Sequence, residues 1–217
     1  MGYNKKIVSV ILARGGSKGI PNKNIIDVNG KPLISYSINA SLKSNVDETW
    51  VSTDSKRIAV VSEGYGANVL DRPKELATDT SQSDDSLIHF ASQIDFDILV
   101  FIQPTSPLIK TEYINSGINM ICNNNYDSVF TAHKEHWTPK WNTNIEPIDW
   151  NIYKRPRRQD VDDLWVENGM FYITKRENLL ASKLRYSGVK GVVEIPIKDS
   201  FQVDVMDDLK LMEKLIK

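Results

Sequence analysis

The sequence contains very little cysteine, which limits how the fold can be held together. Cys122 is the one cysteine among 217 residues, so an internal disulfide and a multi-cysteine zinc site are both excluded. A single thiol suits a reducing compartment, and residues 1–6 contain no apolar signal core. We therefore predict a cytoplasmic protein.

Neither sign of charge is in excess, and long hydrophobic runs are missing as well. Lys+Arg 27 against Asp+Glu 28 gives a formal net charge of -1, so nothing in the overall charge favours binding to a nucleic acid or a membrane surface. The apolar run at 98–102 in the centre of the chain is far below the roughly 20 residues that cross a bilayer. We expect no nucleic-acid partner and no membrane span, and any polyanionic ligand must be met by a local basic cluster.

Two common nucleotide-binding motifs are also absent. The chain has no G-x-x-x-x-G-K-[ST] phosphate loop and no G-x-G-x-x-G dinucleotide fingerprint, which weakens the interpretation as a P-loop kinase or as a Rossmann dehydrogenase. A different glycine-containing segment, ILARGGSKGIPNKN at 11–24, overlaps the end of the first predicted strand.

Hydrophobic periodicity predicts alternating strands and helices along most of the chain. At 41% apolar and 25% charged residues, the composition is that of one globular domain over 1–217. Repeated β-α units imply an α/β fold of three layers with a mostly parallel sheet. The predicted strands are 7–13, 50–52, 68–70, 97–103, 128–132, 170–174 and 191–197. The predicted helices are 33–42, 55–65, 84–94, 111–123 and 206–216.

One segment, 133–167, interrupts this alternation. It carries four of the five tryptophans, three prolines and a run of mixed charge, which is typical of an excursion from the main sheet. The four tryptophans are Trp137, Trp141, Trp150 and Trp165. So much aromatic surface needs a partner to bury it.

The segment 11–24 carries the clearest chemistry. Its adjacent glycines let backbone N–H groups turn inward without a Cβ in the way, and the hydroxyl of Ser17 adds a donor, so together they form a cradle for phosphate oxygens. Arg14, Lys18 and Lys23 supply three positive charges with no acidic residue in the segment. That charge suits a triphosphate. A flexible turn with solvated lysines is the alternative for the glycine pair taken alone.

The whole sequence resembles the cytidylyltransferases that activate sialic acids and related nonulosonic acids as CMP-sugars. The residues 13–24 look like the signature loop of that family, and further matching motifs are spread along the chain. These motifs are GKPL at 30–33, VSTD at 51–54, RP at 72–73, ELATD at 75–79, QPTSPL at 103–108, RRQ at 157–159, NGMFY at 168–172 and VD at 203–204.

The resemblance implies a three-layer Rossmann-like nucleotidyltransferase fold and a magnesium-dependent transfer of CMP from CTP. In that reaction the anomeric hydroxyl of the nonulosonic acid attacks the α-phosphorus, and pyrophosphate leaves. Arg14, Lys18 and Lys23 would hold the triphosphate and neutralise charge in the transition state. Asp204 would be the metal ligand, since a carboxylate oxygen suits Mg²⁺.

The resemblance also assigns residues to the two substrates. The nucleotide-binding set is Ala13, Arg14, Gly15, Ser17, Lys18, Lys23, Asn24, Arg72, Thr78, Asp79 and Thr80. The sugar-binding set is Gln103, Arg158, Asn168 and Tyr172, of which Gln103 should project from the carboxyl edge of the sheet and Arg158 could grip a carboxylate with two parallel hydrogen bonds.

Plainer interpretations stand beside these roles. Arg72 with the residues 78–80 could be the capped start of a helix, and a lone tyrosine on a strand such as Tyr172 is more often part of a core. The basic run that includes Arg158 precedes several aspartates, so it could be a solvated, self-neutralising loop.

The sequence departs from the family pattern at three places. Gln202 stands where many relatives have the first aspartate of Asp-x-Asp, so Asp204 would hold the metal with phosphates and water unless Asp207 or Asp208 compensates. Val166 and the pair 109–110 stand where arginine is common in the family. These last two departures leave the identity of the sugar open.

The resemblance implies a homodimer formed through 133–167, and this segment could deliver Arg158 to the partner's sugar pocket. Two other functions stay open at this point. One is a nucleotidyltransferase acting on another sugar or a sugar 1-phosphate, because the GKPL motif is shared by that wider superfamily. The other is a non-catalytic nucleotide-binding regulator, which the loss of a carboxylate at Gln202 makes conceivable.

Overall fold

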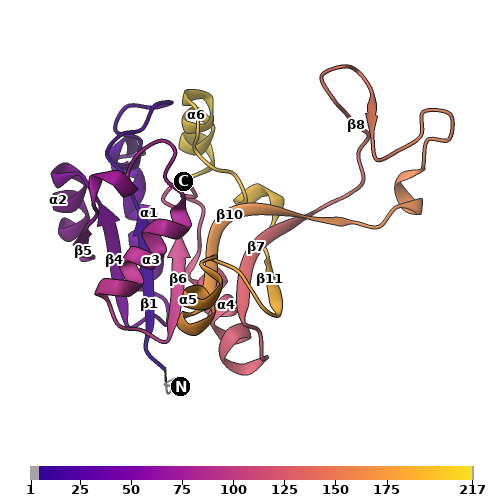
Figure 1. Ribbon diagram of the computed structural model, residues 1–217. Helices are drawn as coiled ribbons and strands as arrows, with labels where there is room; N and C mark the ends of the chain where they lie inside the picture. The colour runs from indigo at the N-terminus through magenta and orange to yellow at the C-terminus, as the bar shows by residue number, and fades with distance from the viewer. Residues whose placement is uncertain (1–4, 217) are drawn as a thin grey trace.

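The computed structural model describes residues 5–216, and its centre is one seven-stranded sheet (Figure 1). The strands lie in the order β11 (Lys190–Glu194), β7 (Ser128–Glu135), β10 (Leu164–Lys175), β6 (Ile98–Ile102), β1 (Ile7–Leu12), β4 (Glu48–Thr53) and β5 (Asn68–Asp71). Adjacent strands are parallel except for β10, which runs antiparallel to both β6 and β7. The predicted α/β class with a mostly parallel sheet is thereby confirmed.

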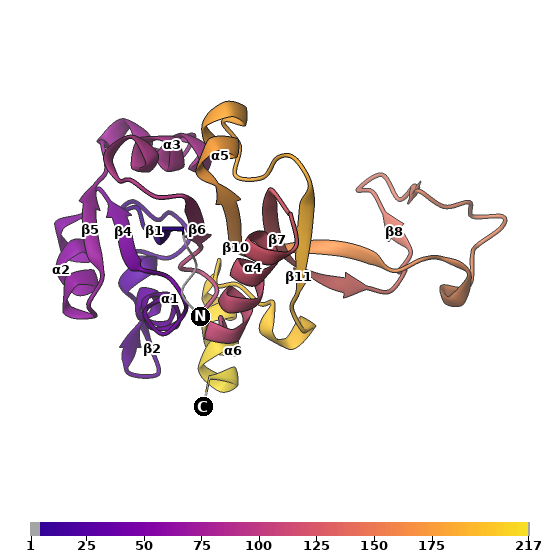
Figure 2. The same cartoon turned by 90° about the horizontal axis from the view of Figure 1, so that it is seen from below.

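Helices cover both faces of the sheet and complete the predicted three layers. On one face, α1 (Leu33–Leu42), α2 (Lys56–Gly64) and α4 (Thr111–Asn123) share a core with the strands, and on the other α3 (Ser83–Gln93) and α5 (Arg176–Ser182) do so. Figure 2 shows α3 and α5 on the side of the sheet opposite α1 and α4. Within 5–216, no helix has both the length and the apolar character needed to cross a bilayer.

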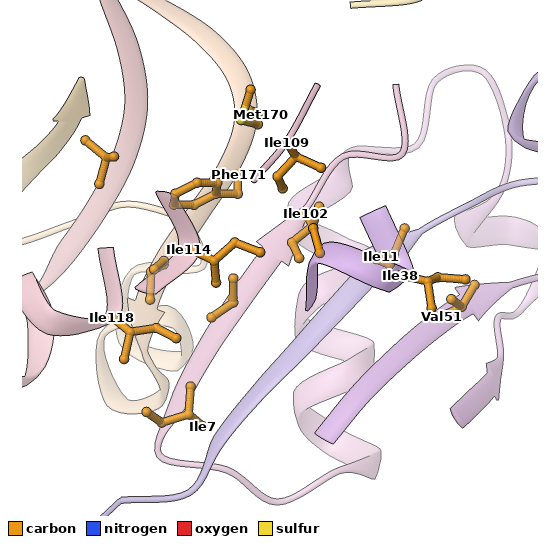
Figure 3. Close-up of a cluster of buried hydrophobic side chains, with 14 of the residues drawn as sticks. Ile7, Ile11, Ile38, Val51, Ile102, Ile109, Ile114, Ile118, Met170 and Phe171 are labelled. Carbon is orange, nitrogen blue, oxygen red and sulfur yellow. The ribbon is translucent and has the colours of Figure 1, made fainter. Parts of the chain in front are cut away.

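The alternation of side chains along β6 explains why two cores form. Ile98, Val100 and Ile102 point to the face covered by α4, whereas Leu99 and Phe101 point to the face covered by α3. Successive side chains of a strand alternate between the faces of a sheet, so an unbroken apolar run is buried on both sides. The larger core, with Phe171 packed near Ile114 and Ile118, is drawn in Figure 3.

A small hairpin and the last helix form a third cluster. The strands β2 (Asp27–Val28) and β3 (Lys31–Pro32) pair through a turn in which Asn29 and Gly30 have φ angles of 51° and 80°. Positive φ at both turn positions is the reason that Asn-Gly is favoured in two-residue hairpins. The helix α6 (Met206–Leu215) packs on this hairpin through Leu209 and Met212.

The segment 136–163 leaves the sheet as an extended arm (Figures 1 and 2). The chain runs out along the end of β7 and returns along the start of β10, and Glu135 pairs with Leu164 at its base. The arm contains the short strands β8 (Lys140–Trp141) and β9 (Pro147–Ile148) and the 3-10 helix η3 (Arg158–Asp160). A direct return without a crossover helix makes the two long strands antiparallel, and this explains the orientation of β10.

The aromatic residues of the arm bury one another only in part. The ring of Trp150 lies 5.0 Å from that of Trp141 and 6.3 Å from that of Trp137, both with edge-on geometry. Trp141 is still 44% exposed and Tyr153 is 97% exposed, and Trp165, at the base of the arm in β10, is 45% exposed. The arm therefore keeps an apolar surface that the rest of the described chain does not cover.

Candidate active site

A cavity of about 390 Å³ opens at the carboxyl ends of β1 and β6, the edge at which open α/β sheets usually bind ligands. Its walls come from the loop after β1, from the turn before α3 and the first turn of that helix, and from the end of β6. The polar lining residues are Arg14, Ser17, Lys18, Lys23, Asn24, Arg72, Thr78, Asp79, Ser81, Gln82, Ser83, Ser86, Gln103 and Thr105.

The loop after β1 is held in place by side chains from elsewhere in the fold. The Gly15 N–H donates to Asp54 Oδ1 at 2.8 Å, and the buried Asn24 side chain donates to the carbonyl oxygen of Arg14 at 2.9 Å. The Gly15 amide is therefore already bonded within the protein. Gly15, together with Ala13 and Thr80 of the predicted nucleotide set, does not line the cavity.

Two glycines of this loop allow close approach. A Cβ on Gly15 would lie 3.0 Å from Ser55 Cβ, and one on Gly19 would lie 2.9 Å from the carbonyl oxygen of Asp204. Gly19 lines the cavity and brings the loop against the C-terminal segment that carries Asp204. A larger residue at either position would push the loop away from its support.

The three predicted phosphate-binding cations all reach the site, and each has an acidic partner. Arg14 Nη1 lies 2.8 Å from Asp79 Oδ1 and Lys18 Nζ lies 2.6 Å from Asp79 Oδ2. Lys23 Nζ lies 2.9 Å from Asp204 Oδ1. The hydrogen bond from Lys18, followed by that from Arg14, lowers the pKa of Asp79 below its ordinary value.

Arg72 is a fourth cation in the wall, and it is almost fully buried. Its guanidinium donates to the carbonyl oxygen of Ser52, whereas its Nε has no hydrogen-bond partner. Burial lowers the pKa of Arg72 to about 10, so the group stays charged at neutral pH. The buried hydroxyl of Thr105, on the same cavity, also lacks a partner. Buried polar atoms without partners are rare, and these two lie just behind the surface of the cavity.

The turn before α3 is ordered by its own hydroxyl groups. Ser81 Oγ donates to the carbonyl oxygen of Glu75 at 2.7 Å, lies 2.6 Å from Thr78 Oγ1, and accepts the Thr78 N–H at 3.2 Å. This network presents Asp79 to the cations of the opposite loop. The helix α3 begins next to it, so its N-terminal dipole adds positive potential to the cavity.

Gln103 faces the other end of the cavity and is fixed by tight packing. Gly169 has a φ of 67°, and a Cβ there would lie 3.2 Å from Gln103 Nε2 and 2.7 Å from Gln202 Nε2. The side chain of Gln202 donates to the carbonyl oxygen of Asn168. Gln202 therefore ties the C-terminal segment to the turn beside Gln103, so its side chain serves the structure of this corner.

Two predicted sugar-binding residues, Asn168 and Tyr172, do not line the cavity. Asn168 Nδ2 donates to Ser200 Oγ at 2.9 Å, and its Oδ1 accepts the Met170 N–H at 3.2 Å. Tyr172 stacks on Phe101 with ring centres 5.6 Å apart. Burial, then its hydrogen bond to a neighbouring glutamate, raises the pKa of Tyr172 above its ordinary value. Tyr172 therefore supports the lining residue Phe101 from behind, whereas the hydrogen bonds of Asn168 hold the turn at Gly169.

The fourth predicted sugar-binding residue, Arg158, lies on the arm. It begins η3, is exposed, and does not line the cavity of its own chain. The neighbouring Arg157 is the residue that pairs with Asp160, through Nε and Nη2 at 2.7 and 2.8 Å. The self-neutralising interpretation of this loop therefore applies to Arg157.

The carboxylates near the C-terminus have different surroundings. Asp204 lies beside the phosphate-side loop with its side chain 65% exposed, whereas Asp208 Oδ2 accepts the N–H groups of Asp204 and Val205, both at 2.9 Å. Asp207 pairs with Lys210. Within 5–216, no three His, Cys, Asp or Glu side chains are grouped as a metal site. Asp204 does not line the cavity, but it lies against the lining residues Gly19 and Lys23, and its exposed carboxylate oxygens are of the type that suits magnesium.

Several residues that line the cavity were not predicted from the sequence. Ser83 and Ser86 enter the cavity from the first turn of α3, and Thr105 enters from the turn after β6. Asp54, which holds the Gly15 amide, was recognised only as part of a motif. Hydroxyl residues at a predicted helix start are a signal that could have identified the two serines.

Comparisons with known proteins agree with this geometry. Residues 8–215 match the family model described as Cytidylyltransferase. N-acylneuraminate cytidylyltransferase A of Danio rerio is 37% identical over 222 residues, which cover 98% of this chain and 51% of the relative. CMP-N,N'-diacetyllegionaminic acid synthase of Legionella pneumophila is 35% identical over 226 residues, which cover 98% and 97%. The chain spans about half the length of several of the curated relatives it matches.

A solved structure has the same fold at lower identity. The structure of CMP:2-keto-3-deoxy-manno-octonic acid synthetase complexed with CTP superposes with a TM-score of 0.74, at 21% identity and with 97% and 98% of the two chains covered. At this identity the likeness concerns the fold alone. Together with the family match over 8–215, the signature loop after β1 and the cavity that it lines, these findings show that the chain belongs to the cytidylyltransferase family.

Proposed function

We propose that the protein transfers CMP from CTP to the anomeric hydroxyl of a sialic-acid-like nonulosonic acid. The observation that carries the proposal is the cavity at the carboxyl ends of β1 and β6, which four cations line. These are Arg14, Lys18, Lys23 and Arg72. A triphosphate matches this charge, and the two relatives named above act on N-acylneuraminate and on a legionaminic acid according to their names.

The chemistry is a displacement at phosphorus. The anomeric oxygen of the sugar forms a bond to the α-phosphorus of CTP, the bond from that phosphorus to the bridging oxygen breaks, and pyrophosphate leaves with the electron pair. The hydroxyl proton passes to solvent. Arg14, Lys18 and Lys23 bind the phosphate oxygens and stabilise the charge that develops on the leaving group.

The remaining walls suit the two organic parts of the substrates. Arg72 and the hydroxyl residues Thr78 and Ser81 line the part of the cavity that would receive the cytidine. The side-chain amide of Gln103, held against Gly169, offers both a donor and an acceptor to the sugar acid.

We further propose that Mg²⁺ assists the reaction and that Asp204 is its main protein ligand. When bound, the ion would neutralise charge on the phosphates. The support is the position of this exposed carboxylate beside Lys23 and Gly19 of the phosphate-side loop. Because Gln202 is engaged with the carbonyl of Asn168, it has a structural role here.

We also propose a homodimer in which the arm packs on a second copy. The partly exposed Trp141 and Trp165 and the exposed Tyr153 provide the apolar surface. Arg158 lies on this arm outside the cavity of its own chain, which leaves it free to serve the partner's cavity. A two-fold arrangement would make both sites equivalent. A cytoplasmic location is part of the same proposal and is supported by the single cysteine.

The deciding experiment measures pyrophosphate release from CTP with a panel of substrates. We expect release with at least one nonulosonic acid among N-acetylneuraminic, legionaminic and keto-deoxynonulosonic acids, and we expect it to depend on Mg²⁺. Release with a sugar 1-phosphate alone would assign a different nucleotidyltransferase activity. CTP binding without release under all conditions would indicate a nucleotide-binding regulator.

A further inference from the structure

One acidic residue lies where the proposed function places a polyanion. Among the described residues that line the cavity, Asp79 is the one that carries a carboxylate, and Arg14, Lys18, Lys23 and Arg72 are basic. A carboxylate in a cavity for a triphosphate is unfavourable unless it has a role of its own, because like charges at short range repel.

The contacts of Asp79 are those that a phosphate would make. Its Oδ1 lies 2.8 Å from Arg14 Nη1, and its Oδ2 lies 2.6 Å from Lys18 Nζ. Each carboxylate oxygen thus engages one cation from the opposite loop, and the two cations converge on one anion. The side chain of Lys18 is 80% exposed, and its ion pair with Asp79 directs its ammonium group toward the cavity.

The segment that carries Asp79 lies at the surface and is held mainly by its own hydrogen bonds. The hydrogen bonds of Thr78 and Ser81 stay within the turn and its neighbour Glu75, and the side chain of Asp79 is 42% exposed. A shift of this turn would break the two ion pairs without opening either hydrophobic core. Exposed ion pairs of this kind contribute little stability, so a ligand of higher charge can replace the carboxylate.

We propose that Asp79 is an exchangeable internal counter-ion, which holds Arg14 and Lys18 in place in the free protein and releases them to the triphosphate. The inference rests on the proposed use of this cavity for CTP and deepens it. In the free protein the carboxylate keeps both cations oriented and keeps them from binding weakly charged anions. After pyrophosphate has left, the carboxylate takes the cations back.

The test is the binding of inorganic pyrophosphate and of CTP, measured by calorimetry without sugar. Asp79→Asn keeps the shape and an acceptor oxygen but removes the charge that competes with phosphate. We expect the variant to bind pyrophosphate about threefold to tenfold more tightly than the wild type, the range given by one or two exposed ion pairs. Asp79→Ser, which also removes the acceptor oxygen, should show the same direction.

A matched control separates local competition from overall charge. Glu75→Gln changes the net charge equally, on the same segment, at a side chain that does not line the cavity. Its affinity should stay within about twofold of the wild type. In a Lys18→Met background, where one of the two shared cations is gone, the gain from Asp79→Asn should shrink.

The outcomes distinguish this inference from the proposed function. Equal or weaker pyrophosphate binding by a folded Asp79→Asn protein would overturn it, as would a failure of both forms to bind pyrophosphate. Weaker binding of CTP alone would instead make Asp79 a ligand of the nucleoside and would also contradict the exchange. A protein that shows the expected gain but releases no pyrophosphate from CTP with any sugar would keep the inference and lose the proposed reaction.

Discussion

The sheet body and the arm of this protein use the same kinds of residue in opposite ways. In the body, aromatic and aliphatic side chains such as Phe171 and Ile118 are fully buried between the sheet and its helices. In the arm, Tyr153 is 97% exposed, and the tryptophans pack mainly on one another. The body can therefore supply its own stability, whereas the arm has apolar surface to offer to another molecule.

The two regions also divide the proposed chemistry. The cations Arg14, Lys18 and Lys23 all line a cavity of the body, and Arg158 alone of the predicted site residues lies on the arm. If the arm serves a second copy, the nucleotide half of each site belongs to one chain and part of the sugar half belongs to the other. The following predictions test this division.

The largest loss of stability is expected when a substitution creates a void in the hydrophobic core of the body. Phe171→Ala removes a ring with no exposed surface from the core beside Ile173 and Gly117. The unfolding free energy in urea should fall by about 3 to 5 kcal/mol, because a large void replaces close-packed atoms. A loss below about 1 kcal/mol would contradict the view that the body, unlike the arm, is stabilised by its own buried core.

A change of one phosphate-binding cation should act on the reaction and leave the fold intact. Lys18→Ala should reduce turnover by about a hundredfold or more, by analogy with removing one donor to a developing oxyanion. Initial rates of pyrophosphate release at saturating CTP give the measurement. Lys43→Ala, at an exposed lysine beyond the end of α1, is the control and should keep wild-type rates. A folded Lys18→Ala protein with normal turnover would remove Lys18 from the site.

Mixing two inactive chains tests whether the arm crosses to a partner. Lys18→Ala damages the cavity, and Arg158→Ala damages the arm. In a heterodimer of the two, one site would carry both lesions and the other would carry neither, so activity should recover to about half of the wild-type value per dimer. No recovery despite demonstrated subunit exchange would show that Arg158 does not act across the interface. A monomer at micromolar concentration would lead to the same conclusion.

An ion pair between the half-exposed Lys110 and the buried Asp199 should have a moderate and pH-dependent effect on stability. Although burial alone would raise it, hydrogen bonds from Lys110 and Tyr113 lower the pKa of Asp199 below its ordinary value. A carboxyl group whose pKa is lower in the folded state stabilises the fold at pH values above its unfolded-state pKa. This stabilisation is lost as the pH falls through the folded-state pKa. Asp199→Asn should cost about 1 to 3 kcal/mol at pH 7.

The pH profile is what identifies this contribution. The difference between Asp199→Asn and the wild type should stay constant from about pH 5 to 8 and shrink below about pH 4, where the carboxylate of the unfolded chain is protonated. Asp95→Asn, at a side chain that is 94% exposed, is the matched control and should change stability by less than about 0.5 kcal/mol. A difference that grew in acid would contradict the assigned sign.

The smallest effect on unfolding is expected in the arm. Tyr153→Ser should change the unfolding free energy of the isolated chain by less than about 0.5 kcal/mol, because the ring has almost no contacts to lose. Sedimentation equilibrium of the same variant should show weaker association if the arm is an interface. A large loss of stability in a monomeric form would mean that the arm supports its own body.

The sequence predicted much of the body because its signals are local. The helix at 111–123 has the predicted ends, and β6 lies within the predicted 97–103. The β2–β3 hairpin was missed although its Asn29-Gly30 turn is a known signal, and α5 was missed because seven residues give too little periodicity. The length and direction of β10 depend on pairing with β7 across the whole arm, which no local pattern encodes.

Residues of the candidate site were predictable from the sequence where they directly follow a strand. Contacts between residues that are far apart in the sequence were not. Lys18 and Gln103 line the cavity as their motifs indicated. The ion pairs of Asp79 arise only when two loops far apart in the sequence meet. Tyr172 packs against Phe101 because the two residues are directly paired on neighbouring strands. Whether Tyr172 is part of the core or contacts a ligand therefore depends on the register of the sheet.

The contact between Lys23 and Asp204 joins residues that are 181 positions apart. The phosphate-side loop is synthesised before Asp204, so a chain interrupted between the two lacks this contact. Any ligand that binds to both side chains stabilises their association by mass action. If CTP binds there as proposed, it would act as a folding aid, and proteolysis of the segment that carries Asp204 would be slower in its presence.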